Sequence, residues 1–347
     1  MTQTTLPIKS WCKKGLSLVL VFTVISSSYL FLKSATTRNF VHWDKLNYWA
    51  ILIACLALVA SWFIEALRIR LIASGLGSRI SLMKVLSINM ATAFTGNVTP
   101  FNSGGVPTQI YLLCQCGIQP GKASAIVTIR VIFTTLLFTL LSPLLLTFYY
   151  TKFSTGLVHQ ITTVAIPVAY LLTVFLIAFI IKPKIARYLV SFIIKCLKSG
   201  KLGAKLEPVL TKALNEIEIF HESIRMFRKG LNFYFVIILT FLYWATFFSI
   251  APLLMYVFNY NATEVFLESI LFQFVLVFVL AYLPIPGGSG IMELSLFSVF
   301  VFIPLHVRAF FILIWRFLSY YLSTIIGGFV LLRIINRPAD PTAVLPN

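Results

Sequence analysis

Long apolar runs constrain what this chain can fold into more than any other feature. A helix needs about 20 predominantly apolar residues to cross the hydrocarbon core of a bilayer, because each residue adds about 1.5 Å. Only 11% of the residues are charged, against roughly a quarter in soluble domains. We therefore predict an all-α polytopic membrane protein, a single domain over residues 1–347 with a helical bundle over 15–335. About six spanning helices are expected, at Gly15–Leu32, Tyr48–Leu67, Val131–Tyr149, Ile161–Ile181, Leu231–Phe258 and Val307–Leu332.

The positions of the charges predict the orientation of these helices. The net charge is +18, and the segment 182–230 is rich in Lys and Arg, whereas 151–160 and 259–263 are nearly free of them. Cytoplasmic loops carry such an excess of Lys and Arg. We therefore expect both termini in the cytoplasm and 182–230 to form a basic amphipathic helical insertion there. Anionic lipids of the inner leaflet, rather than nucleic acid, are the expected partner of this charge.

Two motifs interrupt this regular pattern at membrane depth. "NVTPFNSGGVPTQ" (97–109) and "LPIPGGSG" (283–290) place Pro and Gly at the middle of segments that must begin and end on the same side. We predict two opposed re-entrant hairpins, one from each side, since broken backbone is tolerated there only around protein or a polar cavity. Opposed broken helices are typical of transporters with inverted repeats. The alternative is an ordinary tight turn between two short helices.

Three ionisable residues, Arg130, Arg316 and Glu293, are predicted deep in the membrane, where such groups are costly and usually functional. The arginines either bind an anionic headgroup or pair with Glu293 as a structural network. Glu293 either caps its helix or faces the cationic part of a headgroup, whereas Glu65 and Arg68 suggest a local structural pair. The two motifs add candidate substrate-binding positions that supply free backbone N–H groups and polar side chains: Asn97, Thr99, Pro100, Gly104, Gly105, Gln109, Pro286, Gly287, Gly288 and Gly290.

The sequence resembles a known family at these motifs. "NVTPFNSGGVPTQIYLL" and "LPIPGGSGIMELSLF" are similar to the paired signatures of the lysylphosphatidylglycerol synthase transmembrane, or flippase-like, family. "ALRIRLIASGLG", "VTIRVIF" and "WRFLSYYLSTIIGG" extend the resemblance over about residues 15–335. The chain departs from the family at Ile129, where many relatives carry Glu, and at Ile291, where relatives often have Gly.

The resemblance implies a membrane region that flips a lipid. In the full-length multiple peptide resistance factors this region is joined to a soluble aminoacyltransferase domain that makes lysyl-phosphatidylglycerol. The membrane part is taken to flip that lipid outward, which lowers the negative charge of the envelope toward cationic peptides. We expect this chain to lack the transferase domain, so a phosphatidylglycerol lysyltransferase label would rest on family resemblance alone. The implied location is the bacterial cytoplasmic membrane.

Three functions fit these observations. The first is a translocase for an anionic or aminoacylated phospholipid, and the second is a carrier of polyisoprenoid phosphates in envelope synthesis. The third is a membrane scaffold that transports nothing. An enzyme is least expected, because the sequence contains no metal cluster, nucleophile–base pair or nucleotide loop. No cofactor or metal is expected, and a homo-oligomer is compatible with the sequence.

Overall fold

A computed structural model describes residues 46–153, 222–227, 230–260, 265–280 and 285–336, together with a few isolated positions. The described residues are helical, and four helices are long and apolar enough to cross a membrane. These four match the predicted runs that begin at 48, 131, 231 and 307. The predicted runs Gly15–Leu32 and Ile161–Ile181, and most of the insertion 182–230, lie outside the described residues.

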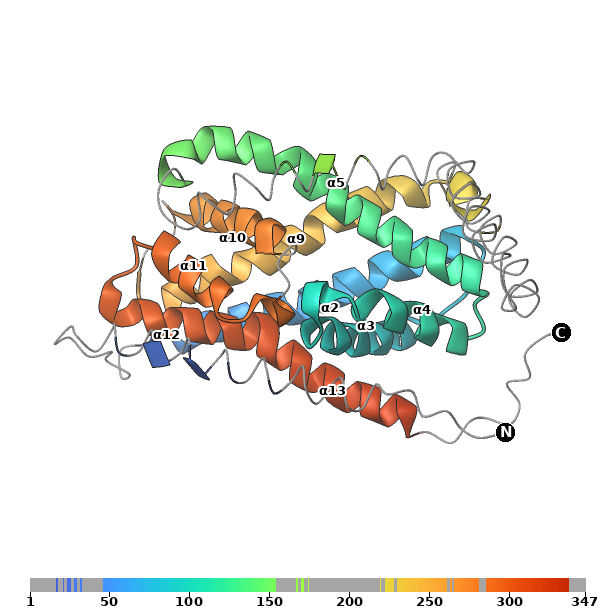
Figure 1. The fold of residues 1–347 in the computed structure, drawn as a ribbon, viewed down its shortest axis with the longest axis horizontal. Coiled ribbons are helices and arrows are strands. Elements are labelled where there is room, and N and C mark those ends of the chain that lie inside the picture. The colour runs from blue at the N-terminus through green and yellow to red at the C-terminus, as the bar shows by residue number, and fades with distance from the viewer. Residues whose placement is uncertain are drawn as a thin grey trace, which may run out of the picture.

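The helices follow one another in two similar sets (Figure 1). Each set has a long helix, a pair of shorter helices with a brief 3-10 turn between them, and a further long helix. The first set is α2 (Tyr48–Gly75), α3 (Leu82–Asn97), η2 (Pro100–Asn102), α4 (Gly105–Gln115) and α5 (Pro120–Phe153). The second set is α9 (Asn232–Val257), α10 (Phe266–Leu280), η3 (Pro286–Gly288), α11 (Ile291–Val299), α12 (Leu305–Arg316), η4 (Phe317–Tyr321) and α13 (Leu322–Ile335).

Helices α2 and α9 pack against each other in opposite directions. The backbone N–H of Asn47, at the start of α2, donates to the carbonyl of Val257, at the end of α9, at 2.9 Å. At the other end, Asn232 Nδ2 donates to the carbonyl of Leu71 at 3.2 Å. Because the first helices of the two sets are antiparallel, the sets run in opposite directions. Figure 1 accordingly places α5 and the α12–α13 rod on opposite sides of the molecule.

The contacts between helices repeat from one set to the other. Helix α2 packs on α3 as α9 packs on α10, and α4 packs on α5 as α11 packs on α12. Contacts between the sets also come in pairs, because α3 packs on α13 and α10 packs on α5. Gly327 allows the first of these, since a Cβ there would lie 2.1 Å from the carbonyl oxygen of Met90. Small residues permit such close helix approach in membranes.

The two breaks begin with the same backbone conformation. Thr99 and Ile285, which precede the prolines, are extended, with φ of −113° and −109°, as expected before proline. The residues directly after the two prolines are left-handed, with φ of 56° at Phe101 and 57° at Gly287. Phe101 is not a glycine, and a left-handed residue with a Cβ costs about 1–2 kcal/mol. The helices are interrupted at both Pro- and Gly-containing motifs, as predicted, but the left-handed residues of the first break are Phe101 and Asn102 rather than glycines.

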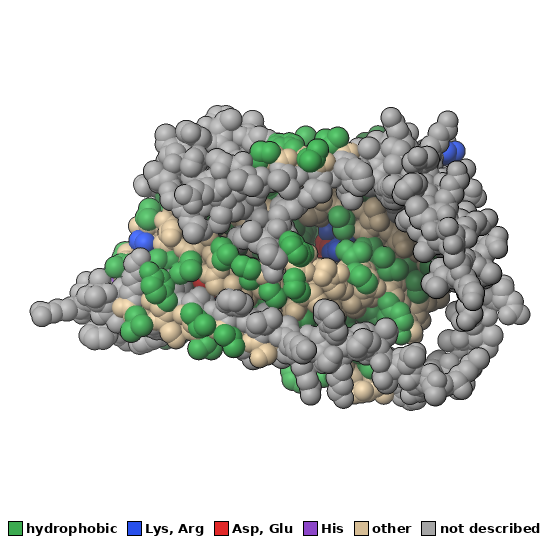
Figure 2. Space-filling view, viewed as in Figure 1, with side chains coloured by type: hydrophobic (Ala, Val, Ile, Leu, Met, Phe, Trp, Pro, Cys, Tyr) green, Lys and Arg blue, Asp and Glu red, His purple; other side chains and the backbone are tan. Residues whose placement is uncertain are grey.

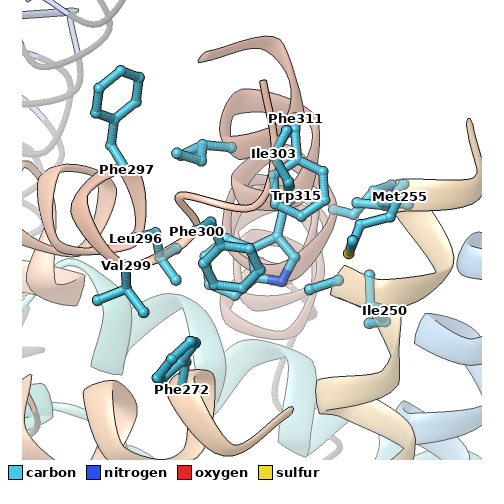
Figure 3. Close-up of a cluster of buried hydrophobic side chains, with 14 of the residues drawn as sticks. Ile250, Met255, Phe272, Leu296, Phe297, Val299, Phe300, Ile303, Phe311 and Trp315 are labelled. Atoms are coloured by element: carbon cyan, nitrogen blue, oxygen red, sulfur yellow. The ribbon is translucent and has the colours of Figure 1, made fainter. Parts of the chain in front are cut away.

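A buried hydrophobic cluster joins helices α9, α10, α11 and α12 of the second set to α2 of the first set. Trp315 lies at its centre among Phe300, Phe311 and Met255 (Figure 3). The indole N–H of Trp315 donates to Gln273 Oε1 at 3.0 Å. This packing sets the position of the next residue in the chain, Arg316.

Candidate functional site

The tips of the two broken helix pairs lie next to each other, since η2 packs beside η3. Tyr320, from η4, joins them. Its hydroxyl donates to the carbonyl of Asn97 at 2.9 Å, and its ring lies so close to Gly287 that a Cβ there would be 2.1 Å from the hydroxyl oxygen. The amide of Asn97 donates to Thr324 Oγ1 at 2.7 Å. Segments from both sets therefore meet at one tyrosine, which we call the bridging tyrosine.

Arg316 and Glu293 form a buried ion pair beside this junction. Arg316 Nε donates to Glu293 Oε1 at 2.9 Å, and the two side chains are 6% and 0% exposed. Arg316 Nη2 donates to the carbonyl of Gly287, and its guanidinium lies 4.0 Å from the ring centre of Tyr320. The backbone N–H of Gly290 donates to Glu293 Oε2 at 2.6 Å. Glu293 is therefore both the cap of α11 and the charge partner of Arg316.

A π-helix lies at this point of the α12–α13 rod. Residues Phe317–Tyr321 form η4 directly after Arg316. Such segments insert an extra residue into a helix and occur frequently at functional sites. The segment carries Tyr320 to the junction and Tyr321 to Glu293, whose Oε1 lies 3.5 Å from the Tyr321 hydroxyl.

The second deep arginine belongs to a different cluster. Arg130, on α5, donates through Nη1 to Glu65 Oε1 at 3.2 Å. Glu65 also pairs with Arg68, one turn along α2, at 2.7 Å. Arg68 is 1% exposed and donates to the hydroxyls of Thr134 and Thr240, at 3.2 Å each. Helices α2, α5 and α9 therefore share one polar cluster, which we call the Glu65 cluster.

The motif residues have local roles that the structure makes visible. Thr99 Oγ1 donates to the carbonyl of Thr95 at 2.8 Å and accepts the N–H of Gly104 at 2.8 Å, so it caps the first break. Gly104 and Gly105 open α4, Pro100 opens η2, and Pro286 and Gly288 are buried in η3. Gln109 differs from all of these, because its side chain is fully buried and neither amide atom has a hydrogen-bond partner among the described residues.

The structure thus groups most of the predicted positions but separates the two arginines. Arg316, Glu293, Asn97 and the η3 residues come together, while Arg130 lies in the Glu65 cluster. Sequence reasoning identified Glu65 and Arg68 as a local pair and missed that they share a cluster with Arg130. The available signal was that all three charges lie inside or directly beside predicted apolar runs. A role in substrate binding stays a prediction for all these residues. Within the described ranges, no group of three His, Cys, Asp or Glu residues could hold a metal.

Comparison with known proteins now bears on this arrangement. The model of the family described as lysylphosphatidylglycerol synthase TM region matches residues 15–327. The chain belongs to this family. It is also similar to a UPF0104 membrane protein of Archaeoglobus fulgidus, with 27% identity over 287 residues that cover 82% of this chain and 86% of the relative. No solved structure matches the chain. The residues that match the family model include both broken motifs, the Glu65 cluster and the Arg316–Glu293 pair.

Proposed function

We propose that this protein is a lipid translocase that moves an anionic or aminoacylated phospholipid across the bacterial cytoplasmic membrane. The observation that supports this most is the meeting of two broken helix pairs from oppositely directed halves, beside a buried Arg–Glu pair. Transporters place their substrate sites near the bilayer midplane at such junctions. We further propose that both helix pairs are re-entrant and that both termini are cytoplasmic.

The Arg316–Glu293 pair offers a way to hold and release a headgroup. A guanidinium binds phosphate and carboxylate through the same fork of N–H groups. An incoming phosphate can therefore take the place of Glu293 on Arg316, since both acceptors are anionic. Glu293 is then free to face a cationic part of the headgroup, such as the ammonium of an aminoacyl group. When the lipid leaves, the ion pair forms again and each of its two charges is neutralised by the other.

The outer surface of the helices is suited to contact a lipid whose acyl chains stay in the bilayer. Large hydrophobic side chains are exposed along α2, α9 and α13, and patches of hydrophobic side chains are spread over the described part of the visible face (Figure 2). A headgroup that enters between the helices would leave its acyl chains against this surface. The family is described as the membrane region of a lysylphosphatidylglycerol synthase, which is in keeping with an aminoacylated phospholipid as the substrate.

The test is lipid movement in reconstituted vesicles. Purified protein is placed in vesicles that contain fluorescent phosphatidylglycerol or its lysyl derivative, and a membrane-impermeant quencher measures how much labelled lipid changes leaflet. We expect the wild-type protein to accelerate this exchange and Arg316→Gln to abolish it. Arg333→Gln is the matched control, because Arg333 is exposed on the same helical rod. Movement of polyisoprenoid phosphate instead would favour the carrier, and no movement of any lipid would favour a scaffold.

A further inference from the structure

The Glu65 cluster has a different charge balance from the Arg316–Glu293 pair. Two guanidinium groups share one carboxylate, because Arg68 and Arg130 both pair with Glu65. Among the described residues neither arginine has another acidic partner. One positive charge is therefore left over at a largely buried position, and buried charges are costly unless they are paired. The Arg316–Glu293 pair, in contrast, is neutral as a whole.

The donors of the Glu65 cluster are also incompletely used. The Nε atoms of Arg68 and Arg130 are buried and have no hydrogen-bond partner among the described residues. A structural arginine in the same protein behaves differently. Arg308 donates through Nε, Nη1 and Nη2 to the carbonyls that end α11 and follow it, at 2.7–3.2 Å. Unused N–H donors beside an excess positive charge indicate that the cluster accommodates a further acceptor that carries negative charge.

The cluster is open on one side. The Arg130 side chain is 21% exposed, whereas Arg68 and Glu65 are 1% and 4% exposed. Figure 2 shows a hollow in the face of the molecule, with basic and acidic side chains at its floor and hydrophobic side chains around it. Residues packed around the cluster's helices are apolar, among them Ile69, Ile126 and Phe133. A ligand that reaches the arginines through such surroundings combines an anionic group with an apolar body.

We propose that Arg68 and Arg130 bind the phosphodiester of an anionic phospholipid, with Glu65 orienting the two guanidinium groups. This deepens the proposed function, because it adds a second site for the phosphate of the substrate, apart from the site at Arg316 beside the junction of the broken helices. Two guanidinium groups can each donate to a phosphate oxygen, and charge-assisted hydrogen bonds of this kind are the strong ones. Glu65 keeps the excess to one charge, which matches the single negative charge of a phosphodiester.

The test is binding rather than transport. Purified protein in a non-ionic detergent is titrated with dioleoyl phosphatidylglycerol or with dioleoylglycerol, which has the same acyl chains but no phosphate, and native mass spectrometry counts bound lipid. We expect a clear preference for the phospholipid. Arg130→Gln should lower its affinity about tenfold or more, because charge-assisted contacts are lost. Arg70→Gln, at an exposed position on α2, the helix that carries Arg68, should leave the affinity unchanged. Wild-type affinity in Arg130→Gln would overturn the proposal.

A second variant covers the case in which Arg130→Gln fails to fold. Glu65→Gln leaves both guanidinium groups unneutralised, so affinity for phosphatidylglycerol should rise. Lower thermal stability with unchanged affinity would instead make the cluster a structural ion pair and refute the site. Competition by inorganic phosphate would indicate that the site also accepts the free ion, whereas its absence would assign the site to the lipid. Binding without leaflet exchange would refute translocation but retain this site.

Discussion

Removing the charge of Glu293 should destabilise the protein far more than removing the same charge elsewhere. In Glu293→Gln the shape is kept, but the guanidinium of Arg316 stays charged in a site where Glu293 is fully buried and Arg316 is 5% exposed. Breaking a buried pair by removing one partner costs about 3–5 kcal/mol. The loss includes the charge-assisted hydrogen bond that Gly290 donates to the carboxylate at 2.6 Å. Glu222→Gln is the control, because Glu222 is exposed and surface changes stay within about 0.5 kcal/mol.

The double variant Glu293→Gln/Arg316→Gln distinguishes a pair from two independent contributions. With both charges gone no uncompensated charge remains, so most of the stability should return and the coupling free energy should be about 2 kcal/mol or more. The assay is reversible unfolding in mixed micelles, with each variant compared with the wild type. If the double variant loses the sum of the two single losses, the two side chains do not stabilise each other and the reasoning fails.

Three further predictions concern glycine, glutamine and cysteine positions. Gly287→Ala should lower the melting temperature in detergent more than Gly117→Ala. Both glycines have positive φ, but only at Gly287 would an added Cβ meet another group, the bridging tyrosine. Equal effects would refute the steric argument. Gln109→Leu should raise the free energy of unfolding by about 1–2 kcal/mol, since an unpaired buried amide is removed, while Gln273→Leu should lower it because three hydrogen bonds are lost. With the other cysteines replaced by Ser, Cys116 should be alkylated only from the cytoplasmic side. Burial raises the pKa of the Cys116 thiol, so its alkylation rate should keep rising with pH beyond the range in which a free thiol ionises. Alkylation from the outside would refute the proposed topology.

The sequence predicted the parts of the fold that local composition controls. The run Leu231–Phe258 was expected to span, and α9 covers Asn232–Val257. The breaks at 97–109 and 283–290 were found from Pro and Gly, whose backbone restrictions act within a few residues. Helix α2 extends beyond the predicted end at Leu67 to Gly75, since the apolar run ends at Arg68, whose charge is buried in the packed helix.

Long-range pairing could not be predicted in the same way. Arg130 and Glu65 are 65 positions apart in the chain, so their contact depends on how α5 packs on α2. The partner of Arg316 was one of two stated possibilities, and the structure gives it Glu293. The π-helix after Arg316 has no signal in the local composition, because the sequence from Leu305 continues without a Pro or Gly until Gly327.

The paired contacts between the two halves have a consequence for energy as well as for shape. In the proposed translocation, loosening one of these contacts and tightening the other would exchange the roles of the two halves. Because α3 packs on α13 more extensively than α10 packs on α5, the two states would differ in free energy. Two such states would expose the junction to opposite leaflets in turn, and the more extensive contact would favour one of them at rest. Small differences between the halves, such as phenylalanine in one left-handed turn and glycine in the other, would then set the resting bias of the cycle.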